Sequence, residues 1–175
     1  MKKKLYSILF ASAMLFSFTS NAQHDEGQSN INIGIGFAAF GLSGDATVPP
    51  ISGSYEYGIN DNISVGAFVG YTASEQDLIF AKATYSYLVF GARGSYHKEL
   101  IDDVDTYAGI MVAYNSVGFD IDDPAFENLF DTDLSGIVPG VYLGARYHFT
   151  DNLGAFLELG YGVSAVNLGL TVRFD

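Results

Sequence analysis

The chain has 175 residues, 20 acidic and 8 basic, which gives a formal net charge of −12 and an isoelectric point near 4.3. This acidity argues against nucleic acid as a partner, because phosphates would be repelled. Cysteine is absent, which excludes a disulfide framework and cysteine-based metal or nucleophile chemistry. Since 49% of the residues are hydrophobic, we expect a folded chain rather than a disordered one.

The first 22 residues have the layout of a secretory signal peptide. Three lysines at positions 2–4 precede an apolar run over 5–18, and small residues up to Ala22 resemble a cleavage site. The alternative, a membrane anchor, would need about 20 apolar residues. We therefore predict export and one mature domain over 23–175. Because three lysines fall in the signal, that domain keeps 5 basic residues beside 20 acidic ones, a net charge of −15.

The mature chain alternates apolar and polar residues in eight segments, as strands with two different faces do. These segments cover residues 31–40, 51–57, 63–71, 83–97, 106–119, 136–149, 153–162 and 166–174. At one end the expected links are tight turns over 58–62 and 150–152 and a somewhat longer link over 98–105. At the other end, longer loops are expected over 41–50, 72–82 and 120–135. The pattern predicts an all-β, eight-stranded antiparallel up-and-down barrel.

The character of the polar row indicates which face of the barrel meets lipid. One row of side chains carries no charge, whereas the other holds glycine, small polar residues and a handful of charges. A water-exposed row should be rich in lysine, but the mature chain has only Lys82 and Lys98. We therefore predict a transmembrane barrel with its apolar row outward. Aromatic residues cluster at strand ends, as in two interfacial belts: Tyr57, Tyr96, Tyr147, Phe149 and Phe174 near the turns, and Phe37, Tyr71, Tyr114 and Tyr161 near the loops.

Five charged residues fall on the predicted inward row: Glu56, Arg93, Arg146, Glu158 and Arg173. Buried charges must be paired and hydrogen-bonded, so these residues predict an interior ion-pair network. An eight-stranded barrel is just wide enough for side chains to fill, which excludes an aqueous channel. The catalytic alternative is a Glu56/Glu158 acid–base pair, but the sequence suggests neither a cleft nor a substrate handle for it.

The acidic loop over 120–135 raises a metal hypothesis. From Asp131 to Gly136 it opens like a calcium loop, but the twelfth position is Tyr142 instead of the required glutamate. A cation that bridges several carboxylates is one interpretation, and a solvated acidic surface loop is the other. The candidate ligands are Asp120, Asp122, Asp123, Asp131 and Asp133.

The chain ends in "NLGLTVRFD", and at this point it resembles the small eight-stranded outer-membrane β-barrel proteins of the opacity, OmpX and OmpW-like group, including Bacteroidetes-type barrels. Asn167, Gly169, Val172 and Phe174 fit the terminal pattern by which such barrels are recognised for assembly. The chain departs from the pattern in that Asp175 follows the aromatic residue and Val172 stands where an aromatic is common. The resemblance implies an outer-membrane location, with lipid and the assembly machinery as partners.

For function, we expect a non-enzymatic barrel with exposed loops for surface interaction or envelope structure, no cofactor, an unidentified surface ligand and a monomeric state. The resemblance implies an alternative, an OmpW-like transporter of small apolar molecules. A membrane-embedded enzyme would need a Ser/His constellation. The mature histidines are His24, in a polar N-terminal lead, and His97 and His148, for which interfacial or turn roles are expected, and no nucleophile motif accompanies them.

Overall fold

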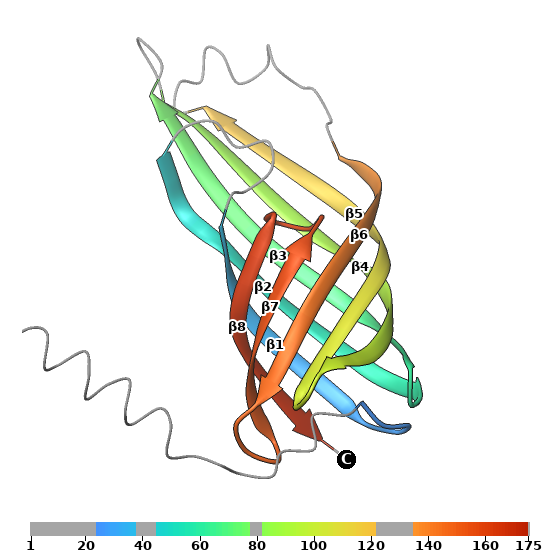
Figure 1. Cartoon of the computed structure of the whole chain (residues 1–175). Helices are drawn as coiled ribbons and strands as arrows, with labels where there is room; N and C mark the ends of the chain where they lie inside the picture. The colour runs from blue at the N-terminus through green and yellow to red at the C-terminus, as the bar shows by residue number, and fades with distance from the viewer. Residues whose placement is uncertain (1–23, 38–44, 78–81, 122–134, 175) are drawn as a thin grey trace, which may run out of the picture.

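The computed structural model describes residues 24–37, 45–77, 82–121 and 135–174, which form a closed antiparallel barrel of eight strands (Figure 1). The strands are β1 (Ser29–Phe37), β2 (Asp45–Asn60), β3 (Ile63–Asp77), β4 (Lys82–Ile101), β5 (Val104–Ile121), β6 (Gly136–His148), β7 (Leu153–Gly160) and β8 (Val166–Phe174). Each strand pairs with its neighbour in the sequence, and β1 closes onto β8. The predicted fold class is confirmed.

The period-two pattern of the sequence appears directly in the burial of the side chains. Along β1, buried and exposed residues alternate without a break from Asn30 to Phe37. Apolar side chains such as Ile33, Ile110 and Val141 are between 68 and 69% exposed, whereas polar residues fill the inside. The apolar row therefore points outward, as predicted for a barrel that faces lipid. No helix in the described part of the chain is long and apolar enough to cross a membrane.

The last strand completes the barrel by pairing with the first over nine residue pairs, from Ser29↔Phe174 to Phe37↔Val166. This closure leaves no unpaired strand edge at the level of the hydrocarbon, where unsatisfied backbone groups would be costly. At its centre Gly34 lies opposite Gly169, where the strands approach closely. A Cβ on Gly169 would lie 2.0 Å from the Ile33 carbonyl oxygen, so any larger residue would push β1 and β8 apart.

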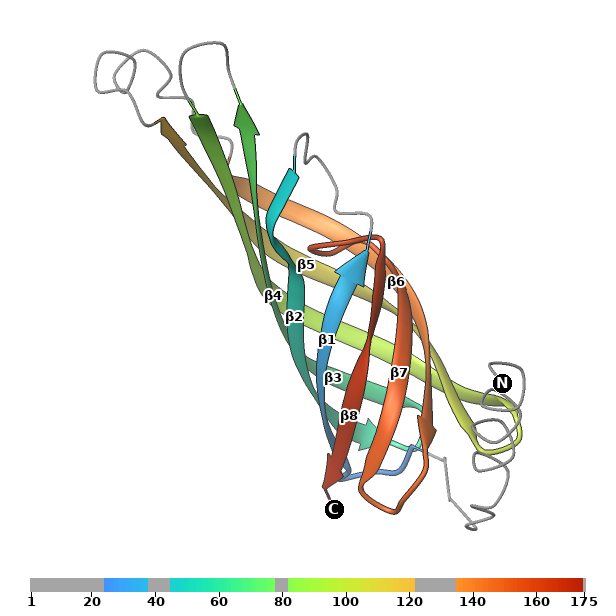
Figure 2. The same cartoon turned by 90° about the vertical axis from the view of Figure 1, so that its left-hand side faces the viewer.

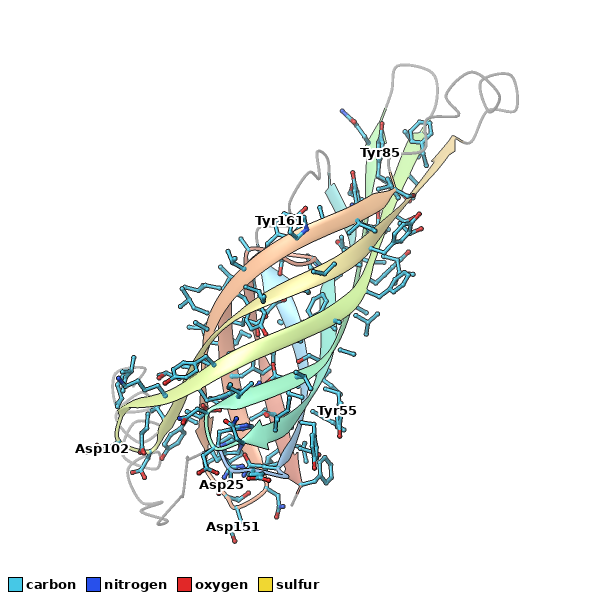
Figure 3. The ribbon with its side chains drawn as sticks, turned by 90° about the vertical axis from the view of Figure 1, so that its right-hand side faces the viewer. Asp25, Tyr55, Tyr85, Asp102, Asp151 and Tyr161 are labelled. Carbon is cyan, nitrogen blue, oxygen red and sulfur yellow. The ribbon has the colours of Figure 1, made fainter. Side chains whose placement is uncertain are left out.

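The turn end of the barrel is tighter than the sequence suggested. The link predicted over 98–105 is wrong, because β4 continues to Ile101 and β5 begins at Val104, which leaves a turn of only Asp102 and Asp103. Asp103 adopts a left-handed conformation with φ of 62°, which aspartate tolerates better than most residues. Figure 3 shows Asp102 and Asp151 at this end of the molecule. The longer strands carry Asp105 into the barrel wall.

The other end of the barrel is uneven, because β3, β4 and β5 rise above β1, β7 and β8 (Figure 2). β4 has 20 residues and β5 has 18, whereas β1 and β8 have 9 each and β7 has 8. The loops predicted over 41–50 and 72–82 are therefore shorter than expected, since β2 begins at Asp45 and β3 extends to Asp77. Pairing between β5 and β6 stops at Asn115↔Gly136, while β5 continues beside β4 to Ile121.

Candidate functional site: a charged interior with a covered mouth

Ion pairs that join opposite walls fill the half of the barrel interior nearer the turns. The buried charged residues of the described chain are three carboxylates and three guanidinium groups: Glu56, Asp105, Glu158, Arg93, Arg146 and Arg173. The charges therefore balance without any imported ion. All five residues predicted for an interior network lie inside the barrel, and Asp105 joins them.

Glu56 on β2 is the centre of the network. Arg93 on β4 places its Nε 2.8 Å from Glu56 Oε1, and Arg146 on β6 donates to Glu56 Oε2. Because β2 and β6 are four strands apart in a ring of eight, the pair between Glu56 and Arg146 spans the bore. Arg93 also donates two hydrogen bonds to Glu158 on β7, from Nη2 at 2.6 Å and from Nη1 at 3.4 Å. Three carboxylate and guanidinium contacts thus tie four strands together across the interior.

Two tyrosines add hydrogen bonds and ring contacts to these charges. Tyr107 donates to Glu158 Oε2 at 3.2 Å, and its ring lies 4.3 Å from the Arg146 guanidinium carbon. Tyr142 accepts from Arg93 Nε at 3.1 Å, and its ring lies 3.8 Å from the guanidinium carbon. The rings have room because Gly144 lies beside Tyr107, where a Cβ would come within 2.4 Å of the ring. The glycines of the inward row therefore make space for the aromatic partners of the arginines.

A chain of polar contacts through Asp105 and His97 continues from the network toward the turn end. Arg146 Nη1 lies 3.3 Å from Asp105 Oδ2, and the other Asp105 oxygen lies 2.9 Å from His97 Nδ1. His97 Nε2 is in turn 2.9 Å from the Ser64 hydroxyl. His97 is therefore a buried polar link, and the interfacial or turn role expected for it is wrong.

The N-terminal lead folds into the mouth at the turn end. His24 is 2% exposed, and its ring stacks on that of His97 with centroids 3.9 Å apart. The Gly27 amide donates to the Gly58 carbonyl at 2.9 Å, and the Gly58 amide donates to the Gln28 carbonyl at 2.8 Å. Neither ring nitrogen of His24 has a hydrogen-bond partner among the described residues. Burial, aided by the neighbouring His97, lowers the pKa of His24 to about 4.

Arg173 lies apart from the Glu56 centre. Its Nη2 is 3.1 Å from Nδ1 of His148, and both side chains are buried. The structure therefore brings Glu56, Arg93, Arg146 and Glu158 together and places Arg173 beside a histidine instead. Like His97, His148 lies inside the barrel, so the interfacial role expected for it is also wrong.

The interior geometry offers little to the catalytic alternative. Glu56 contacts two guanidinium groups and accepts from the Ser95 hydroxyl at 3.2 Å, while Glu158 is held by Arg93 and Tyr107. A general acid or base needs a proton that it can exchange with a substrate. Carboxylates whose oxygens are already taken up by buried guanidinium and hydroxyl donors have no such free position for a substrate.

The half of the interior nearer the loops is packed with apolar side chains. Phe68, Val89, Met111, Ala113 and Val163 are buried there and belong to one cluster with the two tyrosines. Val163 comes from the short turn between β7 and β8 and folds inward, where a Cβ on Gly70 would lie 2.7 Å from it. The turn therefore narrows this mouth of the barrel, as the N-terminal lead covers the other.

The residues of the terminal pattern occupy alternate faces of β8. Asn167 is buried, with its Oδ1 2.9 Å from the Ser164 hydroxyl, and Gly169 lies at the close approach to β1. Phe174 points outward and is 48% exposed. Asn167 and Gly169 thus have packing roles in the closed barrel, in addition to the assembly role predicted for the pattern. Val172, the remaining member, pairs with Ile31, and Asp175 lies outside the described residues.

Most of the proposed cation ligands lie outside the residues that the structure describes. Asp122, Asp123, Asp131 and Asp133 lie outside the described residues, and only the backbone of Asp120 is described, at the end of β5. Within the described ranges, no group of three or more histidine or acidic side chains is arranged to hold a metal ion. The metal hypothesis therefore stays a prediction.

Among acidic and histidine side chains, sequence reasoning missed four members of the interior: Asp105, His97, His148 and His24. Asp105 was assigned to a link and His24 to the N-terminal lead. His97 and His148 were given interfacial or turn roles. One signal was available for Asp105 and His97, since both have the inward parity of their strands. His97 is the last residue of its expected segment, and Asp105 immediately precedes the expected start of the next. No comparable signal marks His24, because it precedes the first strand.

Residues 8–174 match the model of the outer membrane protein beta-barrel domain. The chain belongs to this family. A search of curated proteins finds no match. Among solved structures, OprG of Pseudomonas aeruginosa is 14% identical with a TM-score of 0.58, covering 88% of this chain and 99% of its own. Ail, the attachment invasion locus protein of Yersinia pestis, is 17% identical with a TM-score of 0.56, covering 85% and 99%.

A barrel from the de novo design of transmembrane β-barrels is nearly as similar, with 15% identity and a TM-score of 0.53 over 87% of this chain and 99% of its own. Because a designed barrel and natural ones match almost equally well, the likeness shows the fold alone. The family nevertheless fixes the setting of this barrel as the outer membrane, with its short turns toward the periplasm.

Proposed function

We infer that the chain is a non-enzymatic outer-membrane barrel whose closed interior anchors an acidic extracellular extension of the sheet that binds cationic partners outside the cell. The observation that carries the proposal is the unequal height of the strands. Residues 116–121 of β5 and the facing part of β4 continue beyond the last pair between β5 and β6. A barrel that only had to close would not need them.

The extension is supported by its own contacts. The rings of Tyr85 and Phe119 lie 4.9 Å apart across β4 and β5, and the Val117 amide donates to the Ser135 hydroxyl oxygen at 3.2 Å. Figure 3 shows Tyr85 far from the turn end of the barrel. Such cross-strand pairs stabilise a sheet that has left the membrane. The extension is therefore an ordered platform for the loops that it carries.

The negative charge at the extracellular end of the barrel determines which class of partner can bind there. Glu75, Asp77 and Asp120 lie on the extended strands, and the loop over 122–134 adds five more acidic residues. Of the five basic residues in the predicted mature chain, only Lys82 lies here, 3.9 Å from Glu75. A cationic surface would be attracted to this end and a polyanion repelled. Ail has been crystallised with a heparin analogue, and we expect this chain to avoid such a ligand.

The interior supports anchoring rather than transport. The ion pair between Glu56 and Arg146 crosses the bore, and Val163 and His24 are buried at the two mouths. A solute would have to break buried ion pairs to pass, which is costly. In addition, the closed ring of strands needs no second copy, which supports a monomer. The terminal strand pattern supports delivery by the outer-membrane assembly machinery.

Binding of a polylysine peptide to the protein in nanodiscs tests the proposal. Neutralising the acidic end, with Glu75→Gln, Asp77→Asn and Asp120→Asn together, should weaken binding several-fold and flatten its salt dependence. The matched control neutralises three acidic residues at the turn end, Asp61→Asn, Asp102→Asn and Asp151→Asn, and should bind as the wild type does. Equal losses in both variants would overturn the assignment of the site to the extension.

A flux measurement tests the closed interior separately. Vesicles containing the protein should release small apolar and polar solutes no faster than empty vesicles do. Faster release would revive the transport alternative, whatever the outcome of the peptide experiment.

A further inference from the structure

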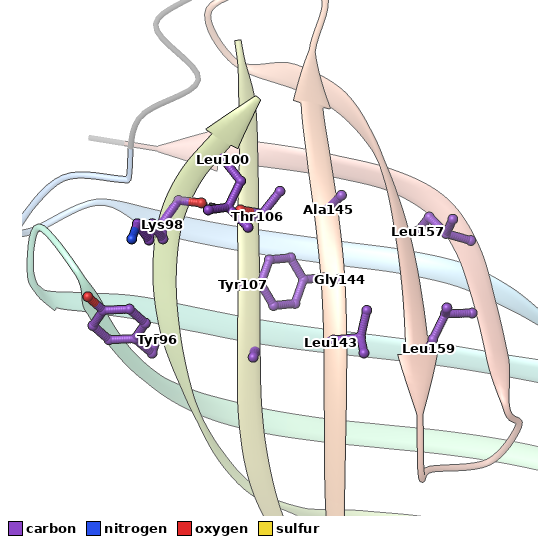
Figure 4. A pocket seen from close by; sticks show the side chains of 11 residues that line it. Tyr96, Lys98, Leu100, Thr106, Tyr107, Leu143, Gly144, Ala145, Leu157 and Leu159 are labelled. Carbon is purple, nitrogen blue, oxygen red and sulfur yellow. Dashed lines mark hydrogen bonds between the residues drawn. The ribbon is translucent and has the colours of Figure 1, made fainter. Parts of the chain in front are cut away.

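A groove runs over the outer surface of the barrel near its periplasmic end (Figure 4). It has a volume of about 440 Å³, within the range of roughly 300–1,000 Å³ typical of ligand pockets. The groove crosses β4, β5, β6 and β7, and most of the side chains that line it are apolar and point away from the interior. It belongs to the lipid-facing surface, and Tyr107 is the one member of its lining that also belongs to the interior network.

The groove exists because small residues lie between large ones in two cross-strand rows. One row runs from Tyr96 through Ala108 to Leu143 and Leu159, and the next from Lys98 through Thr106 and Ala145 to Leu157. In both rows the outer surface is recessed at the small residue on β5, and in the second row the recess continues to the small residue on β6. The lining of this groove is mostly apolar, which suits a hydrocarbon chain lying along the barrel wall.

A single cation stands at the rim of this groove. The predicted mature chain has five basic residues, and three of them, Arg93, Arg146 and Arg173, are inside the barrel. Lys82 lies at the opposite end, beside Glu75. Lys98 is therefore the only outward-facing cation at the periplasmic end, and it makes no ion pair within the described residues. An anionic group at this rim has one place to bind.

The surroundings of Lys98 restrict the type of anion. Glu99, Asp102 and Asp103 follow it around the hairpin and are all exposed, so the tip has a net negative charge. A headgroup with net negative charge would be repelled by this tip. A zwitterionic headgroup would instead place its phosphate at Lys98 and its ammonium among the carboxylates.

We propose that this groove is a binding site for one zwitterionic aminophospholipid of the periplasmic leaflet. One acyl chain lies over Ala108 and Ala145, the phosphate meets Lys98, and the ammonium faces the carboxylates of the β4–β5 hairpin. The proposal concerns the wall of the barrel and does not depend on what the extracellular extension binds.

A second groove on the same outer surface provides an internal control. It has a volume of about 320 Å³ and is lined by Ile31, Ile33, Gly53, Tyr55, Ala67 and Val69, among others. It is as apolar as the first but has no charged residue in its lining. If apolar shape alone held lipid, both grooves would retain it equally. If the headgroup contacts matter, only the groove beside Lys98 will select one.

Native mass spectrometry of the protein, released from nanodiscs with equal amounts of phosphatidylethanolamine and phosphatidylglycerol, tests the proposal. We expect one phosphatidylethanolamine to remain bound, several-fold in excess over phosphatidylglycerol. Lys98→Gln should abolish this preference, and Lys82→Gln should preserve it. Filling the groove with Ala108→Leu should reduce retention, whereas Ala67→Leu in the second groove should not. A heat-dependent shift in gel migration confirms that each variant is folded.

Three results would overturn the proposal: equal retention of the two lipids by the wild type, unchanged selectivity in Lys98→Gln, or equal effects of Ala108→Leu and Ala67→Leu. The first requires no variant, so a folding defect in a variant cannot leave the proposal untested. Loss of polylysine binding at the extracellular end has no bearing on these outcomes.

Discussion

The two halves of the barrel interior are filled in different ways. Toward the periplasm, Glu56, Arg93 and Arg146 tie together walls that are distant in the sequence. Toward the outside, Phe68, Met111 and other apolar side chains pack together, beside neutral polar residues such as Asn167 and Ser164. The charged half is specific, because each group needs a partner in a fixed place. The apolar half depends on volume, because any chain that fills the same space is tolerated better.

The largest expected effect comes from breaking the charged half. Arg146→Met should lower the free energy of unfolding by about 3–5 kcal/mol, because Glu56 and Asp105 would each lose a buried partner. Urea titration of the protein in vesicles, followed by heat-dependent gel migration, measures this loss.

The control is Lys82, an exposed lysine at the extracellular end of β4. Lys82→Met removes a cation that lies 3.9 Å from Glu75 at the surface, and should cost about 0–1 kcal/mol. Similar losses in the two variants would mean that the crossing ion pairs do not stabilise the barrel.

A smaller effect is expected in the apolar half. Met111→Ala should lower the free energy of unfolding by about 2–4 kcal/mol, because the interior cannot collapse around the cavity. Val112→Ala, on the next residue but facing lipid with 58% exposure, should cost under about 1 kcal/mol, since lipid can fill the space. The same unfolding assay compares them, and a larger loss for Val112→Ala would contradict the assigned faces.

The smallest effect concerns the lead that covers the charged half. His24 is buried with its pKa lowered to about 4, facing His97 and Asp105, whereas an undocked histidine titrates near 6.5. Between these values the undocked lead binds a proton that the docked lead does not. Acidification from pH 6.5 to 4 should therefore weaken docking, by on the order of 1 kcal/mol per pH unit.

Hydrogen exchange of the Gly27 amide, which donates to Gly58 when the lead is docked, measures this equilibrium. Exchange protection should fall as the pH is lowered, after correction for the intrinsic rate. His24→Phe keeps a ring in the same place without a titrating group, so its protection should not change with pH. Identical profiles for the two proteins would show that His24 does not control the lead.

Much of this architecture was predictable from the sequence, and the failures have a common cause. Alternation assigned Ile33 to the outside and Glu56 to the inside, and the structure agrees. The charged members of the predicted network were identified, but not their pairing, and Arg173 contacts His148. Asp105 and His97 were missed because turn-type residues near the hairpin obscured the end of each strand. The deepened groove on the outer wall was also invisible, since its rows combine four strands.

The sequence by itself determined the closed eight-stranded barrel and the direction of its faces. This was possible because strand parity is local: every second residue points the same way, so composition reveals which row meets lipid and which meets the interior. Only the tertiary structure decided that Arg146 reaches Glu56, that His24 covers the mouth and that Lys98, Ala108 and Ala145 line one groove. These contacts depend on the register between strands and on which walls face each other across the bore, and neither is encoded within any single strand.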